Sequence, residues 1–389
     1  MIIRKIEANI FFGMSFQPAV AVTGLRQVGK TTLVRHIQEK LSDQCLYFDL
    51  EDQRILRTIS ADPATFMEGL ADKTIILDEV QRLPELFPAL RGLIDRDRRP
   101  GRFVLLGSAS FALLKNTSES LTGRISYFEL HPFQLNELPA KTDVNRHWFR
   151  GGLPESFLAS GDEVQSKWMS DYISNYLERD FPQLGLSANP VLMRRLLTML
   201  ASIQGQLLNQ SSISRTLGIR QNSLAGYLDF LENALFIYRL QPYFTNIGKR
   251  LTRTPKIYLQ DSGLVHSLLF IQGVEQLLKH PVAGGSWEGY VLAQVLPVLK
   301  PHQLPFFYRT ADGAELDLVI EEAGKIRLAI EVKRSNAVKI SKGISTALQD
   351  LGNPCLLMVT PDTEIHSPRR GIQAIPVSAI AEFLKEKLS

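Results

Sequence analysis

The fold of the N-terminal third of this chain follows from the sequence Ala21-Val22-Thr23-Gly24-Leu25-Arg26-Gln27-Val28-Gly29-Lys30-Thr31-Thr32. It fits G-x-x-x-x-G-K-[ST] without a mismatch, between an apolar run at 19–22 and a helical pattern at 31–37. In that context the glycines let successive backbone N–H groups wrap phosphate oxygens. We therefore predict a nucleoside triphosphate site formed by Gly24, Leu25, Arg26, Gln27, Val28, Gly29, Lys30, Thr31 and Thr32.

The chemistry of this loop assigns roles to its last residues. Lys30 is expected to reach the β- and γ-phosphates, and the Thr31 hydroxyl to ligate Mg²⁺. Further along, the apolar run Thr74-Ile75-Ile76-Leu77 ends in two carboxylates. Asp78 is predicted to serve Mg²⁺ and Glu79 to orient the attacking water. The alternative is an ordinary acidic pair that opens a loop after a buried strand.

Two further polar residues are candidates for this site. Ser108 follows the apolar run 103–107, where a small polar side chain would lie near the γ-phosphate. Its alternative role is that of a helix N-cap before residues 111–114. Arg124 is the candidate for an arginine that stabilises charge in the transition state, and a surface salt bridge is its alternative. If Arg124 acts on a neighbouring subunit, the protein must be a homo-oligomer.

The pattern of apolar runs predicts an α/β fold, because each run is followed by a helical pattern. We expect a parallel sheet with helices on both faces and strands at 19–23, 45–50, 74–77, 103–106 and 126–130. The predicted domains are a P-loop ATPase domain at 1–135, a helical region at 136–190, a winged-helix-like domain at 191–261 and a last α/β domain at 262–389.

A compact helical unit lies in the middle of the chain. Helices are expected at 193–204, 211–218 and 221–234, and the short second one resembles that of a helix-turn-helix. Residues 236–243 and 256–259 are expected to pair as a β-wing with its tip at 246–248. Duplex DNA is a possible partner, because basic and amide side chains gather here: Arg215, Arg220, Gln221, Asn222, Lys249, Arg250 and Arg253. A protein–protein role for this unit is the alternative.

The last third carries a second group of acids. A helix is expected at 287–299 with Glu288 at its start, and strands at 306–309, 315–320 and 328–332 around an Asp312-Gly313 turn. Asp317 and Glu331, with Glu288 as a further ligand, are predicted to hold a second Mg²⁺ or Mn²⁺, and Lys333 to activate water. The alternative is that charged residues alternate because one face of the sheet is wet.

Composition excludes several classes of protein. A net charge of +4 permits a nucleic-acid partner without requiring one. No run of 18 apolar residues is present, so no membrane span is expected. Cys45 and Cys355 show neither metal-ligand spacing nor a disulfide framework, as in a reducing cytosol. These features predict a cytoplasmic protein.

The whole chain resembles bacterial and archaeal AAA-type ATPases that carry a C-terminal, restriction-endonuclease-like domain of unknown function. The resemblance rests on the loop at 24–32 and on the motifs at 77–81, 107–108, 121–124, 132–133, 151–155, 176–180, 258–264, 287–288 and 315–333. Two departures, Leu25 for proline and Thr122 for alanine, leave the phosphate-binding side chains in place. The resemblance implies ATP hydrolysis.

Two hypotheses follow for the C-terminal domain. In the first, it is a metal-dependent nuclease whose access to DNA is gated by ATP turnover. In the second, the protein is a regulatory or remodelling ATPase, and the inert nuclease-like domain binds protein or nucleic acid.

Overall fold

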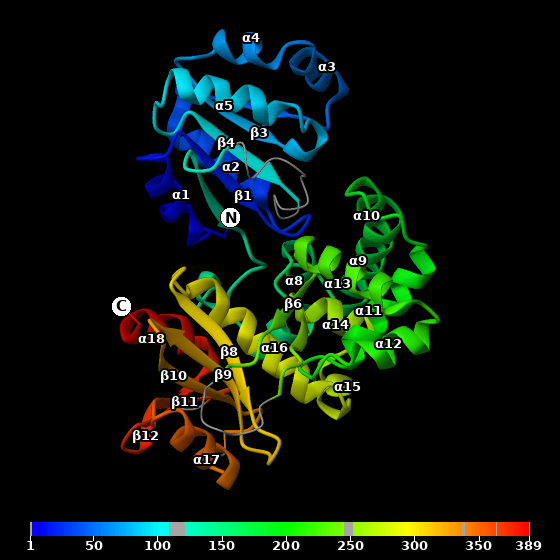
Figure 1. The fold of residues 1–389 in the computed structure, drawn as a ribbon, viewed down its shortest axis with the longest axis vertical. Coiled ribbons are helices and arrows are strands. Elements are labelled where there is room, and N and C mark those ends of the chain that lie inside the picture. Colours follow the sequence, from blue (N-terminus) through cyan, green and yellow to red (C-terminus); the bar gives the residue numbers. More distant parts are fainter. Residues whose placement is uncertain (1, 109–120, 245–251, 337–338, 363, 389) are drawn as a thin grey trace. The chain divides into compact units, whose positions relative to one another are not determined.

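The computed structural model describes residues 2–108, 121–244, 252–336, 339–362 and 364–388 (Figure 1). The chain divides into two compact units. The first comprises residues 1–132 with 233–235, and the second comprises 133–232 with 236–389. Among the described residues, no helix has both the length and the apolar character needed to cross a membrane.

The first unit is built on a five-stranded parallel sheet. Its strands are β1 (Ala19–Thr23), β2 (Cys45–Asp49), β3 (Thr74–Asp78), β4 (Phe103–Gly107) and β5 (Ile125–Glu129), in the order β2-β3-β4-β1-β5. The predicted strands and their parallel pairing are confirmed to within a residue at each end. All residues of β1, β3 and β4 are buried, as the continuous apolar runs of the sequence require.

Helices cover both faces of this sheet. One face packs Ala19, Ala21, Ile75 and Leu77 against α3 (Gln53–Ala61), α4 (Pro63–Glu68) and α5 (Leu86–Arg96). Val20 points to the opposite face, where α1 (Ile6–Met14) approaches so closely that a Cβ on Gly13 would lie 3.3 Å from it. The helix that follows the phosphate loop is α2 (Lys30–Leu41). Figure 1 shows α3, α4 and α5 together on one side.

The second unit begins with helices. They are α7 (Val144–Arg150), α8 (Pro154–Phe157), α9 (Asp162–Asn175), a π-helical turn at Tyr176–Asp180 and α10 (Phe181–Gln183). The predicted helical trio follows as α11 (Pro190–Ser202), α12 (Gln210–Leu217) and α13 (Gln221–Asn233). Strands β6 (Ile237–Leu240) and β7 (Lys256–Leu259) then pair antiparallel, which confirms the predicted pairing. The predicted wing tip lies outside the described residues.

The end of the chain forms a mixed six-stranded sheet in the order β12-β13-β11-β10-β9-β8. Strands β8 (Gln303–Arg309), β9 (Glu315–Glu322) and β10 (Lys325–Val332) are antiparallel neighbours, and β10 runs parallel to β11 (Cys355–Thr360). The other elements are α14 (Ser262–Leu268), α15 (Val274–Lys279), α16 (Ala283–Val295), α17 (Lys342–Asp350), β12 (His366–Arg369), β13 (Ile372–Pro376) and α18 (Ile380–Lys387). The predicted hairpin at Asp312-Gly313 is present, with Gly313 at φ 86°.

Three predicted element starts in this region are wrong, and one of them is that of β10, which begins at Lys325 rather than at Leu328. Helix α16 begins at Ala283 rather than at Trp287, because its early glycines serve packing: a Cβ on Gly285 would lie 1.9 Å from the Gln204 carbonyl oxygen. Strand β8 begins at Gln303 rather than at Phe306, although Pro305 lies within it. A proline is tolerated there because β8 is the edge strand of the sheet.

Candidate functional site

The phosphate loop connects the end of β1 to the start of α2. A Cβ on Gly24 would lie 2.4 Å from the Leu130 carbonyl oxygen, so only glycine fits beside that backbone. Gly29 precedes α2 with φ 99°, in the left-handed region. These two conformations direct the loop's backbone around the helix N-terminus, which is a favourable place for an anion.

Lys30 is held inside this loop. Its buried ammonium group donates to the carbonyl oxygens of Gly24, at 3.0 Å, and Leu25, at 2.9 Å. Burial lowers the pKa of Lys30 to about 8, against the opposing charges of Glu79 and Asp78. The lysine is therefore still mostly protonated at pH 7, and a phosphate group would offer it a charged acceptor in place of two neutral ones.

Asp78 lies at the centre of a set of hydrogen bonds. The Thr31 hydroxyl donates to its Oδ2 at 2.8 Å, and the Tyr47 hydroxyl donates to the same oxygen at 2.7 Å. The backbone N–H of Glu79 donates to Oδ1 at 2.9 Å. A threonine hydroxyl beside a buried carboxylate is a donor set that fits Mg²⁺, a hard cation that takes oxygen ligands. Sequence reasoning missed Tyr47, which the parallel pairing of β2 with β3 brings to this edge of the sheet.

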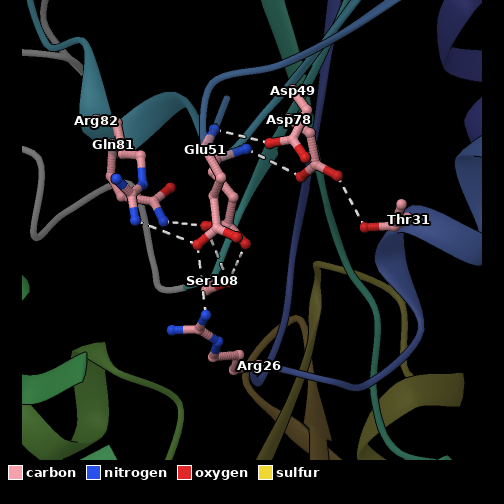
Figure 2. A network of polar contacts seen from close by, with 9 residues as sticks. Arg26, Thr31, Asp49, Glu51, Asp78, Gln81, Arg82 and Ser108 are labelled. Carbon is pink, nitrogen blue, oxygen red and sulfur yellow. Dashed lines mark hydrogen bonds and ion pairs between the residues drawn. The ribbon is translucent and has the colours of Figure 1, made fainter. Parts of the chain in front are cut away.

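Glu79 is held from two sides. Ser108 Oγ donates to both of its carboxylate oxygens, at 3.0 and 3.2 Å, and the Gln81 side-chain amide donates to Oε2. The backbone of Glu79 has φ 55°, a conformation that is uncommon for residues other than glycine and is often found at functional sites. Figure 2 shows Ser108 within this network of polar contacts. The alternative role of Ser108, capping a helix at 111–114, lies outside the described residues.

A second carboxylate beside the loop pairs with two arginines. Glu51 Oε1 accepts from Arg26 at 3.4 Å and from Arg82 at 3.2 Å (Figure 2). Arg26 belongs to the phosphate loop, and Arg82 follows the Asp78-Glu79 pair. The motifs in the sequence predict no role for Glu51 or Arg82. Their positions could have identified them, because each lies a few residues after the end of a parallel strand.

Arg124 has a carboxylate partner in the structure. Its Nε and one terminal nitrogen donate to the two oxygens of Asp95, at 2.7 and 3.0 Å, and the other terminal nitrogen donates to the Thr122 carbonyl. Asp95 lies in α5 and also has Arg91 and Arg98 as neighbours. The guanidinium is therefore occupied by a two-point ion pair, and any catalytic use of Arg124 requires that pair to open.

The acids of the C-terminal sheet surround a lysine that sequence reasoning missed. Lys256, in β7, has only 3% of its side chain exposed. Its Nζ lies 2.9 Å from Glu288 Oε1, 3.0 Å from Glu315 Oε1 and 3.8 Å from Asp317 Oδ1. Burial lowers the pKa of Lys256, but the charges of these three acids outweigh that effect and raise the pKa above its ordinary value.

The remaining predicted residues of this cluster are also paired. Lys333 Nζ donates to Glu331 Oε1 at 2.5 Å, and the Val332 N–H donates to Asp317 Oδ2 at 2.8 Å. Burial, followed by the charge of Asp317, raises the pKa of Glu331 to about 8. A cavity of about 240 Å³ lies at this end of the sheet, lined by Gly313, Glu315, Asp317, Glu331, Ser341, Gly343 and Ile344.

These acids do not fit the predicted second metal site. Within the described residues, no group of three or more histidine, cysteine, aspartate or glutamate side chains has an arrangement that could hold a metal ion. The ammonium group of Lys256 lies among Glu288, Glu315 and Asp317, and the Glu331 carboxylate is bound by Lys333. The sequence places the right ligand types in order, but the fold adds a cation from a distant strand.

The polar residues of the helical trio lie on its surface. Arg220, at the start of α13, and Gln221 and Asn222 in its first turn are exposed, as are Arg215 on α12 and Arg253 before β7. Two other candidates for DNA contact, Lys249 and Arg250, lie outside the described residues. Arg220, Gln221 and Asn222 thus present exposed polar side chains at the start of α13.

Comparison with known proteins identifies the domains. Residues 16–139 match a family described as AAA domain, and residues 141–275 and 283–380 match two domains of unknown function, DUF8612 and DUF4143. Uncharacterized proteins of Mycobacterium bovis and Mycobacterium tuberculosis are each 42% identical over 377 residues, which are 97% of this chain and 84% of each relative. The chain belongs to their family. As a member, it carries an AAA-type ATPase domain at its N-terminal end.

A solved structure shows a more distant likeness to this AAA-domain protein. A Walker-type ATPase of Pyrococcus abyssi is 15% identical and matches with a TM-score of 0.49 over 69% of this chain and 96% of the other. The description of the match at 283–380 names no activity, so the predicted restriction-endonuclease-like character of that region stays a prediction.

Proposed function

We propose that this AAA-domain protein hydrolyses ATP with Mg²⁺ at the loop between β1 and α2. The observation that carries the proposal is the contact between Thr31 and Asp78, at 2.8 Å, beside the buried ammonium group of Lys30. These side chains come from two places in the sequence, 30–31 and 78, and would meet the terminal phosphates of a bound nucleotide.

The residues of this proposed ATP site have different roles in hydrolysis. Lys30 leaves the carbonyl oxygens of Gly24 and Leu25 and neutralises phosphate charge. Thr31 and Asp78 would hold Mg²⁺, which supplies a positive charge that stabilises the phosphate oxygens. Glu79 orients the attacking water and accepts its proton, and Ser108 and Gln81 fix the direction of the Glu79 carboxylate.

The proposal is tested by separating binding from turnover. We expect Glu79→Gln to bind ATP as the unchanged protein does but to release phosphate about 10²–10⁴ times more slowly, the range for losing a general base. Lys30→Ala should lose nucleotide binding itself. Glu39→Gln, on the exposed face of α2, is the matched control and should retain both activities. Full turnover in Glu79→Gln would contradict the role given to Glu79.

We further propose that the start of α13 contacts duplex DNA. Support comes from the order of elements, three helices followed by the β6–β7 ribbon, and from exposed Arg220, Gln221 and Asn222 where such a unit meets a groove. Arg220→Ala should weaken DNA binding and lower its dependence on salt by about one released ion. Lys385→Ala is the control, because Lys385 is an exposed side chain on α18. Binding equal in both variants would favour a protein partner instead.

For the C-terminal sheet we favour the hypothesis of an inert binding domain over that of a nuclease. Lys256 Nζ lies 2.9 Å from Glu288 and 3.8 Å from Asp317, which are two of the three predicted metal ligands. Lys333 is bound to Glu331, the third, rather than free to activate water. A cleavage assay on single-stranded, duplex and branched DNA with Mg²⁺ or Mn²⁺ tests this. Cleavage that disappears in Asp317→Ala would restore the nuclease hypothesis.

A further inference from the structure

The surroundings of Lys256 are built from two parts of the second unit that are distant in sequence. Lys256 lies at the first position of β7, opposite Leu240 of β6. The acids around its Nζ come from elsewhere, Glu288 from α16, and Glu315 and Asp317 from β9. The lysine thus extends from the ribbon into the acid cluster of the C-terminal sheet.

The geometry of the contact is that of a buried cation with carboxylates around it. An ammonium group carries three donors, and two carboxylate oxygens lie within 3.0 Å of Nζ, with a third at 3.8 Å. The ring of Phe307 covers another side, with its centroid 5.5 Å from Nζ. A charge this deeply buried is tolerated only where opposite charges surround it, so the acids and the lysine need each other.

Tyr258 reinforces the same arrangement. It lies two residues after Lys256 on β7, so the two side chains share a face of the ribbon. The Tyr258 hydroxyl donates to Glu288 Oε1 at 2.5 Å, and the same oxygen accepts a hydrogen bond from Lys256 Nζ. One strand therefore supplies both a positive charge and a neutral donor to one buried carboxylate.

We propose that Lys256 is an internal cation that takes the place of a divalent metal ion in the cluster of Glu288, Glu315 and Asp317. The cluster then joins the β6–β7 ribbon to the C-terminal sheet, with the Lys256 ammonium group as its cation. The inference rests on the inert-domain part of the proposed function and is independent of ATP hydrolysis at the N-terminal unit.

Binding of Mn²⁺ by the full-length, nucleotide-free protein tests the proposal. Asp78→Asn serves as the background, because it removes the carboxylate predicted to serve the metal at the phosphate loop. We expect this protein to bind no Mn²⁺ in titrations followed by electron paramagnetic resonance, and Mn²⁺ to leave its melting temperature unchanged. Stoichiometric Mn²⁺ binding that disappears when Asp317→Asn is added would overturn the proposal.

Removal of the lysine gives the second arm. In the same background, Lys256→Met keeps the length of the side chain and removes its charge, so melting should fall by about 10 °C. Mn²⁺ should then bind to the uncovered acids and recover part of that loss. Lys300→Met is the matched control, because Lys300 donates to the Leu388 carbonyl oxygen rather than to an acid. An unchanged melting temperature in Lys256→Met would overturn the proposal.

The proposal can be tested even if Lys256→Met fails to fold, because the Mn²⁺ titration uses the protein in which Lys256 is intact. ATP turnover is measured on the otherwise unchanged protein and on Lys256→Met. If the otherwise unchanged protein does not hydrolyse ATP and the Asp78→Asn protein binds no Mn²⁺, the proposed ATPase function is contradicted and the proposal for Lys256 stands.

Discussion

Ser108 Oγ donates to both carboxylate oxygens of Glu79, at 3.0 and 3.2 Å, across the edge of the N-terminal sheet. The two residues follow different strands, β4 and β3, which pair in parallel and so end at the same edge. The hydroxyl sets the direction in which the Glu79 carboxylate faces, and it leaves the phosphate loop untouched.

Removal of that hydroxyl should therefore affect turnover and spare binding. We expect Ser108→Ala to lower kcat about tenfold, the scale of one lost hydrogen bond to a charged group, with KM for ATP changed less than about twofold. Ser108→Thr keeps the hydroxyl and should recover most of the rate. Equal losses in both variants would show that Ser108 acts through packing.

Variants of Arg124 and Asp95 distinguish a catalytic role for this arginine from a role in the ion pair alone. We expect Arg124→Ala to lower kcat by about 10³-fold or more, the scale of a charge-stabilising arginine, and Asp95→Asn to leave kcat within about twofold. Both variants lose the same ion pair, so an equal and small effect would assign Arg124 to that pair alone. In a homo-oligomer, mixing Lys30→Ala with Arg124→Ala subunits should restore turnover if the arginine acts on its neighbour.

Gly263 tests the close contact that forms the interior of the second unit. A Cβ at this position would lie 2.3 Å from the Arg150 carbonyl oxygen, and backbone cannot move aside as a side chain can. We expect Gly263→Ala to lower the free energy of unfolding by about 3 kcal/mol, the upper range for overpacking. Gly226→Ala, in α13 with open space around it, should instead stabilise by about 0.5–1 kcal/mol. Similar effects at the two glycines would contradict the contact.

His266 predicts how stability depends on pH. Burial lowers the pKa of His266 to about 4, and the ring bonds to the Phe149 carbonyl and to Ser286 Oγ. An unfolded histidine titrates near 6.5, so between pH 6.5 and 4 only the unfolded chain takes up this proton. Above pH 6.5, neutral His266 therefore makes its full contribution to the free energy of unfolding. That contribution is lost as the pH falls, by about 3 kcal/mol at pH 4.

The measurement is urea unfolding at several pH values, followed by tryptophan fluorescence. All three tryptophans, Trp148, Trp168 and Trp287, belong to the second unit, and the Trp148 ring lies 6.0 Å from the His266 ring. The variant His266→Gln should lose less stability between pH 6.5 and 4.5 than the unchanged protein. Burial also lowers the pKa of His147 to about 4. Because His147 is present in both proteins, its contribution to the pH dependence cancels in the comparison. Equal pH dependence in the two would contradict the prediction.

Motifs without assigned chemistry turn out to have structural tasks. Asp261, in the motif at 258–264, accepts the Gly152 N–H at 2.7 Å and caps α14 through the Leu264 N–H. Gly151 must lack a side chain, because a Cβ there would lie 2.0 Å from Asp261 Oδ1. The Trp287 indole donates to the Lys333 carbonyl at 3.0 Å. These contacts explain why glycine, aspartate and tryptophan occupy those positions.

The sequence alone determined the elements and the phosphate loop. Strand positions follow from apolar runs, the loop from glycines that must adopt special backbone conformations, and the hairpin from Asp312-Gly313, because each of these preferences acts within a few residues. Which side chains meet depends on the tertiary structure. Tyr47 reaches Asp78 because β2 pairs with β3, and Lys256 reaches three acids because β7 packs beside α16 and β9. Such contacts depend on packing between segments distant in sequence, which local residue preferences do not encode.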